Sequence, residues 1–253
     1  MKKLLLILVV IGLIACLFVG CTPTTPSEGE GEGEGEGEGE VTRVVLVEIF
    51  SQSGCAYCEI VEPLVEQLAG EYTRDEMILV EERAYGLYSS DEIRDRYEWY
   101  FPSSSDRGTP NVLFNGFNTT HIHGSSTYYT IKSKIEIELA KDAKISITAT
   151  RTSDSTTTTI SGTITNISSS SLGNLVINGM IYKDLGDTGL NYAVTDILEE
   201  QKETITTLEP GESYNFSFTI EDINWDGNNF HGVIFVQDTD SSTKEILQAS
   251  YVD

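Results

Sequence analysis

The spacing of hydrophobic and polar residues changes near residue 143. Between residues 41 and 142, short apolar runs alternate with segments in which apolar side chains recur every three to four residues, which predicts strands alternating with helices. The expected strands are 44–50, 77–81, 111–114 and 118–122. The expected helices are 57–72, 89–100 and 126–140. The first two strands are expected to be parallel, joined by a right-handed crossover through the first helix.

Local sequence signals fix some of the turns and helix ends. The segment Ser89-Ser-Asp-Glu92 has the form of a capping box that opens the second helix. Asn115-Gly116 is typical of a tight hairpin turn between the third and fourth strands. The last helix is expected to present one apolar face, formed by Tyr128, Ile131, Ile135 and Leu139.

From residue 144 the pattern takes a period of two, with many β-branched residues and turns rich in Gly, Asn, Asp and Ser. The expected strands are 145–149, 157–164, 175–182, 214–220 and 232–236, with weaker ones at 203–207 and 245–251. Seven short strands of this kind predict an antiparallel sandwich over residues 143–253. Leu208-Glu-Pro-Gly-Glu212 resembles a loop of Ig-like and fibronectin-like domains, so we expect an Ig-like or fibronectin-like sandwich.

The N-terminus has the features of an export signal. Basic residues at positions 2 and 3 precede sixteen apolar residues, 4–19, which is short for a membrane span and typical of a signal peptide over residues 1–20. Cys16 and Cys21 both end segments similar to bacterial lipoprotein processing sites. Cys16 matches the usual pattern better, whereas Cys21 borders directly on polar sequence and is the favoured lipidation site. An uncleaved anchor or a plain secretory signal is the alternative.

Residues 21–40 form the next segment, with a Pro/Thr stretch followed by alternating Gly and Glu. No apolar residue occurs between Thr22 and Glu40, so this segment cannot form a core. We interpret it as a flexible spacer between a lipid anchor and the folded part. The spacer and the anchor together would place the folded part at the cell envelope, on the outer membrane or the cell surface.

Charge and cysteine content narrow the classes of function. The net charge of −24 makes nucleic acid an unsuitable partner, so attachment to an acidic membrane surface would depend on the lipid anchor. Two of the four cysteines lie in the signal region, which leaves Cys55 and Cys58 for the folded part. A structural disulfide framework is therefore not expected, although disulfides form in exported proteins.

Cys55 and Cys58 stand where a predicted strand gives way to a predicted helix. Residues three apart on the first helical turn share a face, so their sulfur atoms can approach bonding distance. The start of a helix also stabilises a thiolate through unpaired N–H groups and the helix dipole. A Cys-x-x-Cys motif in this context predicts a dithiol redox site.

This part of the chain resembles the thioredoxin superfamily over roughly residues 41–142. Pro63 stands five residues after the second cysteine, as in thioredoxins, and Gly108-Thr-Pro110-Asn-Val resembles the cis-proline segment of that fold. The Cys-x-Tyr-Cys centre with Thr109 before Pro110 is similar to periplasmic disulfide isomerases. The resemblance implies a cis Thr109–Pro110 bond beside the disulfide.

Two positions depart from the family pattern. Gly54 replaces the usual Trp before the first cysteine. The buried acid of thioredoxins would fall on Ile49, and Glu48 beside it is the nearest candidate for a proton acceptor.

The expected function is that of an envelope-anchored thiol-disulfide oxidoreductase, a reductase or isomerase that needs no cofactor. Cys55 would attack a substrate disulfide and Cys58 would resolve the mixed disulfide. Thr109, Pro110 and Tyr57 would contact the substrate, although Tyr57 has an equal claim to a packing role. The expected partners are exported proteins with cysteines or disulfides, and a membrane thiol reductant.

Two other functions remain open from the sequence. The chain is alternatively a binding or structural surface lipoprotein with a non-catalytic dithiol, or a metal carrier that uses Cys55 and Cys58. His121 and His123 have the spacing of two metal ligands on one strand face, but no third ligand is visible. We therefore expect them to be solvated strand histidines and predict no metal site.

Overall fold

The computed structural model describes residues 41–154, 156–183 and 191–252. The predicted signal peptide, both lipidation cysteines and the spacer lie outside the described residues. The helices are α2 (Cys58–Glu71), α3 (Asp91–Tyr100) and α4 (Tyr128–Leu139). The strands are β1 (Val45–Gln52), β2 (Met77–Tyr85), β3 (Asn111–Phe114), β4 (Ile122–His123), β5 (Ile145–Ser153), β6 (Thr157–Asn166), β7 (Leu172–Lys183), β8 (Ala193–Ile197), β9 (Glu203–Leu208), β10 (Ser213–Glu221), β11 (Phe230–Asp238) and β12 (Ile246–Val252).

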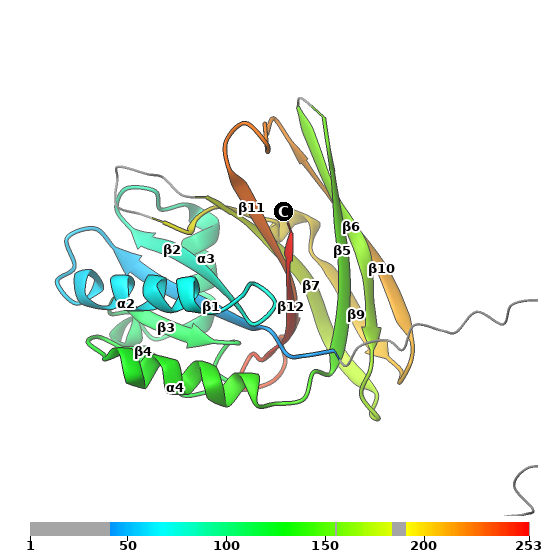
Figure 1. Cartoon of the computed structure of the whole chain (residues 1–253), viewed down its shortest axis with the longest axis horizontal. Helices are drawn as coiled ribbons and strands as arrows, with labels where there is room; N and C mark the ends of the chain where they lie inside the picture. Colours follow the sequence, from blue (N-terminus) through cyan, green and yellow to red (C-terminus); the bar gives the residue numbers. More distant parts are fainter. Residues whose placement is uncertain (1–40, 155, 184–190, 253) are drawn as a thin grey trace, which may run out of the picture. The chain divides into compact units, whose positions relative to one another are not determined.

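The described strands form two sheets in a mixed α/β fold that is mostly β (Figure 1). The larger sheet has the order β12-β11-β7-β8-β2-β1-β3-β4, and β9 pairs with β7. The smaller sheet has the order β10-β6-β5. β1 and β2 are parallel, as predicted, whereas β1 with β3 and β3 with β4 are antiparallel.

The N-terminal part has the predicted element order, βαβαββα, and its helices cover both faces of the sheet. Ile49 of β1 packs in one apolar cluster with Val65 of α2 and Ile131 of α4. Phe50, on the other face of β1, packs with Tyr97 of α3. This alternation follows from the period of two along a strand.

Three predicted element boundaries in this part are wrong. β2 continues to Tyr85 instead of ending at residue 81, because Glu81 and Glu82 lie inside the protein. The N-cap of α3 is Ser90, whose hydroxyl accepts a hydrogen bond from the Ile93 N–H, and not Ser89.

The predicted fourth strand at 118–122 is the third of these errors. Only residues 122–123 pair with β3. Asn115 and Gly116 take the left-handed conformation expected of the turn, with φ of 51° and 73°. Asn118 and Thr119 then bond to the carboxylate of Glu138 on α4, which draws this segment away from the strand.

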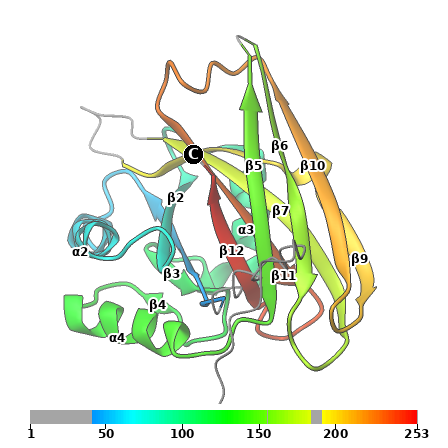
Figure 2. The same ribbon diagram turned by 45° about the vertical axis from the view of Figure 1, so that its right-hand side comes forward.

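The C-terminal part consists of two facing β layers (Figure 2). All seven predicted strands are present, some longer than predicted. Ile160 and Phe218 of the smaller sheet share one buried cluster with Ile177 and Ile234 of the larger sheet. Burial of such side chains stabilises the fold by about 1.5–3 kcal/mol each.

β8 is the strand that the sequence did not predict, and it connects the two parts of the chain. It runs antiparallel to β7 and meets β2 in parallel, with Ala193 opposite Glu81. The larger sheet therefore contains strands of both parts, and residue 142 lies in the loop between α4 and β5. Leu46 and Val80 share a buried cluster with Tyr182 and Phe235 across this connection. Among the described helices, none has the length and hydrophobicity of a membrane span.

Candidate functional site

The cysteine pair lies between the carboxyl end of β1 and the start of α2. Cys55 and Cys58 form a disulfide with a Cα–Cα distance of 5.2 Å. Cys58 is the first residue of α2 and is buried, whereas Cys55 is half-buried. Gly54 has a φ of 72°, a left-handed conformation that disfavours a side chain. A glycine suits this position, because it adopts positive φ without steric cost.

The first N–H groups of α2 point at Cys55. The Cys58 N–H donates to the Cys55 Sγ at 3.2 Å, and the Glu59 N–H donates to the Cys55 carbonyl at 3.1 Å. Tyr57, the N-cap residue, makes no side-chain capping bond. The sulfur of Cys55 thus takes the place of a capping oxygen, a position in which a thiolate is stabilised when the disulfide is reduced.

The Thr109–Pro110 bond is cis and lies beside the disulfide. The Thr109 carbonyl oxygen is 3.3 Å from the Cys55 Sγ. Asn111 fixes this loop by donating to the Gly108 carbonyl at 2.7 Å. The structure therefore brings together Cys55, Cys58, Thr109 and Pro110. Tyr57, also predicted, stands beside the disulfide with 56% of its surface exposed.

Glu48 does not face the cysteines. It lies on the α3 side of β1, where its carboxylate accepts hydrogen bonds from the Arg96 Nε at 2.6 Å and from the Tyr100 hydroxyl at 2.9 Å. Ile49 occupies the α2 side instead. Because side chains alternate along a strand, Glu48 and Ile49 point to opposite faces of the sheet. Glu48, the candidate proton acceptor, therefore forms a buried ion pair with Arg96 of α3.

Two further buried carboxyl groups, Glu81 and Glu82 of β2, were missed by the sequence analysis. Both are fully buried, and none of their four oxygens has a hydrogen-bond partner among the described residues. Burial raises the pKa of Glu81 well above its ordinary value, and the charges of Glu62 and Glu66 on α2 raise it further. Its register partner on β1 is Ile49. In the sequence, the only sign that these carboxyl groups are buried is their position directly after the apolar run 77–80.

The pKa of Glu82 is also raised well above its ordinary value. Burial is the larger cause, followed by the charge of Glu48, while Arg96 opposes both. Glu81 and Glu82 thus face opposite sides of the sheet, one toward α2 and the other toward α3. A buried carboxyl group without a hydrogen-bond partner is stable chiefly in its neutral, protonated form.

Only one of the two predicted strand histidines lies in a strand, because β4 begins at Ile122. His121 lies before β4 and packs edge-on against Phe101 and Phe117, with ring centroids 5.3 Å from each. The Nδ1 of His123 lies 3.1 Å from the Asn111 Oδ1. Both histidines line a pocket of about 480 Å³. Burial lowers the pKa of His121. Within the described residues, no group of three or more His, Cys, Asp or Glu side chains has metal-binding geometry.

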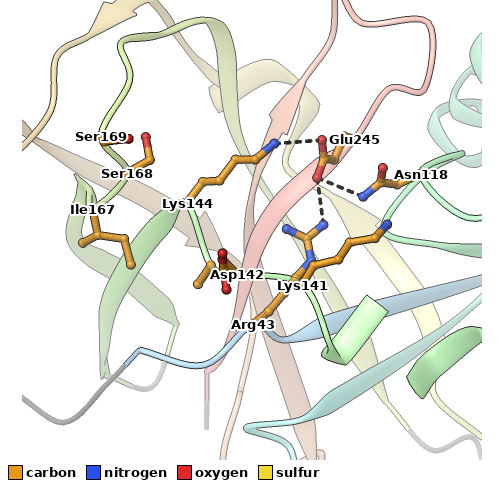
Figure 3. Close-up of a pocket in the computed structure, with 10 residues that line it drawn as sticks. Arg43, Asn118, Lys141, Asp142, Lys144, Ile167, Ser168, Ser169 and Glu245 are labelled. Carbon is orange, nitrogen blue, oxygen red and sulfur yellow. Dashed lines mark hydrogen bonds and ion pairs between the residues drawn. The ribbon is translucent and has the colours of Figure 1, made fainter. Parts of the chain in front are cut away.

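A second pocket, of about 510 Å³, lies at the amino end of β1, the end opposite the cysteines (Figure 3). Its charges are largely paired with one another. Glu245 lies 3.0 Å from Arg43, 3.3 Å from Lys144 and 2.9 Å from the Asn118 amide. Lys141 pairs with the buried Glu138. The lining therefore presents little uncompensated charge to a ligand.

Comparison with known proteins shows similarity at the level of the fold. No family model and no curated protein matches the chain. The structure of HBP35 of Porphyromonas gingivalis is similar with a TM-score of 0.68 and 15% identity, covering 85% of this chain and 76% of that one. This alignment spans most of both parts of the chain, so the combination of the two parts occurs in a solved structure.

Two other solved structures align with smaller shares of the chain. A domain of the outer membrane lipoprotein Omp28 from Porphyromonas gingivalis has a TM-score of 0.31 and 16% identity, covering 44% of this chain and 88% of that one. A thioredoxin-like superfamily protein has a TM-score of 0.30 and 15% identity, covering 40% of this chain and 83% of that one.

Proposed function

We propose that this protein is a thiol-disulfide oxidoreductase of the thioredoxin superfamily that acts on exported proteins at the cell envelope. The observation that carries the proposal is the asymmetry of the cysteine pair. Cys55 is half-buried and receives an N–H of the helix start, while Cys58 is buried beneath it. A nucleophile needs access and a stabilised thiolate, and a resolving thiol needs only to reach the first sulfur.

In the proposed reaction, the reduced protein transfers two electrons to a substrate disulfide. The Cys55 thiolate attacks one substrate sulfur, and the other leaves as a thiolate that takes up a proton. Cys58 then loses its proton and attacks the Cys55 sulfur. This releases the second substrate thiol and forms the Cys55–Cys58 disulfide. Thr109 and Pro110 would align the substrate backbone, with Tyr57 beside it. A membrane thiol reductant would restore the dithiol.

The residues between the cysteines favour reduction or isomerisation over oxidation. Ala56 and Tyr57 supply no positive charge, and the nearby Glu59 opposes a thiolate by repulsion. The helix start stabilises the thiolate by only about 0.3–1 kcal/mol at an exposed site. We expect a reduction potential of roughly −270 to −150 mV, between thioredoxin and the strong oxidants.

Equilibration of the full-length protein in glutathione buffers tests this proposal, with the disulfide state read by mass shift. A potential inside that range supports a reductase or isomerase. A potential near about −120 mV would make the protein a disulfide donor.

The second candidate is a surface lipoprotein in which the β-rich part binds a partner and the dithiol is inert. The size of that part, two layers of strands from β5 to β12, favours it. We infer an Ig-like module that binds a partner or orients the redox site, with lipid attached at Cys21 or Cys16. Alkylation after mild reduction separates the two candidates, because an inert staple resists reduction while an active Cys55 reacts.

A further inference from the structure

Large apolar side chains are unusually exposed around the disulfide. Tyr57 and Ile60, at the start of α2, are 56% and 49% exposed. Leu87 and Tyr88, in the loop after β2, are 66% and 42% exposed, and Tyr85 is 36% exposed. We call these five residues the apolar collar. Exposed apolar side chains gathered in one place mark surfaces that bind other molecules.

The two segments of the collar are neighbours because they follow the carboxyl ends of the adjacent parallel strands β1 and β2. Tyr85 of β2 stands opposite Gln52 of β1, three residues before Cys55. A Cβ at Gly86 would lie 3.9 Å from the Ser53 Oγ, so the two loops are in contact. The collar therefore borders the disulfide on the β2 side, while Thr109 borders it on the β3 side.

The loop that carries Leu87 and Tyr88 is held in its conformation by specific contacts. Gly86 and Tyr88 take left-handed φ values of 91° and 69°. The Ser89 N–H donates to the Gly86 carbonyl at 3.3 Å, and the Ser89 hydroxyl donates to the Ala84 carbonyl at 3.0 Å. A left-handed tyrosine is a strained conformation of the kind found at ligand-binding positions. The fold thus maintains the exposure of these side chains.

We infer that the apolar collar is the docking surface for a cysteine-containing segment of an unfolded polypeptide, with aliphatic or aromatic residues and a Lys or Arg close to its cysteine. This inference rests on the proposed function and names its substrate class. The apolar preference follows from the collar and its continuity with the disulfide. The basic preference follows from the exposed Glu59, between Tyr57 and Ile60, and from the chain's net charge of −24.

Disulfide exchange by the full-length reduced protein tests the inference. The first substrate is a disulfide-linked dimer of the peptide Lys-Phe-Leu-Cys-Leu-Phe-Lys, and the second is glutathione disulfide. Leu87→Ser and, separately, Ile60→Ser remove apolar surface without disturbing the core. Ile137→Ser is the matched control, because Ile137 is 50% exposed on α4, away from the collar.

We expect Leu87→Ser and Ile60→Ser each to lower kcat/KM for the peptide about tenfold and to leave the rate with glutathione disulfide unchanged. Ile137→Ser should change neither rate. A version of the peptide with Glu in place of Lys should react more slowly with the wild type.

Three results would overturn the inference. If the wild type exchanges with both substrates and the collar variants match it on the peptide, the docking surface lies elsewhere while the proposed function stands. If the wild type self-associates in sedimentation and Leu87→Ser does not, the collar covers a second copy of the chain. If the wild type exchanges with neither substrate, the oxidoreductase proposal fails as well.

Discussion

The two parts of the chain bury different kinds of polar side chain. Residues 41–142 bury six ionisable side chains, those of Arg43, Glu48, Glu81, Glu82, Arg83 and Glu138. The polar side chains buried in the described part of residues 143–252 are neutral, those of Thr158, Asn166, Asn178, Gln237 and Gln248. Burial of a charge costs several kcal/mol unless it is paired. The N-terminal part therefore carries groups whose state depends on pH and on their partners.

The buried neutral side chains of the C-terminal part have hydrogen-bond partners, and some of these partners belong to the N-terminal part. The Asn166 amide donates to the Ser170 and Leu208 carbonyls at 2.9 and 2.8 Å. Gln237 donates to the Tyr100 hydroxyl of α3, and Gln248 accepts from the Val44 N–H, both at 2.8 Å. The β-rich part thus contacts the N-terminal part through the amides of Gln237 and Gln248 and through the ion pair of Glu245 with Arg43.

The largest effect expected from this contrast is that of Arg96→Met. Arg96 pairs with both Glu48 and Glu82. Its loss leaves the buried Glu48 carboxylate without its cation, which costs about 3–5 kcal/mol of unfolding free energy. Urea denaturation measures the loss. Arg94→Met, which removes an exposed pair with Asp91, is the control and should cost no more than about 1 kcal/mol. If both variants lose the same small amount of unfolding free energy, the buried ion pair contributes no more to stability than the exposed one, and the contrast between the two parts is wrong.

The next largest effect expected is a change in the pH dependence of stability, caused by Glu81. The folded pKa of Glu81 is raised, so the folded protein holds a proton that the unfolded chain releases above about pH 4.5. Its contribution to stability is present below that pH and is lost as pH rises through the folded pKa. Each unit of difference in pKa corresponds to about 1.4 kcal/mol. Wild-type stability should therefore fall with rising pH, and Glu81→Gln should make this fall shallower.

Urea denaturation across a pH series measures the slope for this variant. Glu59→Gln, on the exposed side of α2, is the control and should keep the wild-type slope. An unchanged slope for Glu81→Gln would mean that this carboxyl group is charged in the folded protein.

The smallest effect is expected in the apolar cluster between the two sheets of the C-terminal part. Ile234→Val removes one methylene group from the cluster between the two sheets and should cost about 0.5–1.5 kcal/mol. Because no titratable group takes part in this packing, the cost should be equal at pH 5 and pH 8. A cost that depends on pH would show that the packing between the two sheets is coupled to the buried ionisable groups of residues 41–142.

The features predicted correctly from the sequence are those set by neighbouring residues. The helical spacing of Ile131 and Ile135 and the alternation along 157–164 each fix a local conformation, and so does the left-handed backbone of Asn115-Gly116, although the tight hairpin expected there does not form. The Cys55–Cys58 proximity and the cis Thr109–Pro110 bond also follow short motifs.

The features that were missed depend on distant parts of the chain. Glu81 and Glu82 are buried only because α2, α3 and β8 close over β2. β8 itself is a five-residue strand whose pairing partners, β7 and β2, are far apart in sequence. Glu48 was a candidate by sequence position, but strand alternation turned it toward Arg96.

Trapping of mixed disulfides tests the central claim most directly. Cys58→Ala and Cys55→Ala forms of the full-length protein are each incubated with a disulfide-containing polypeptide, and covalent adducts are counted on non-reducing gels. With Cys55 as the nucleophile and Cys58 as the resolving thiol, Cys58→Ala should accumulate adducts and Cys55→Ala should not. Equal trapping by both variants, or none by either, would contradict the assigned roles.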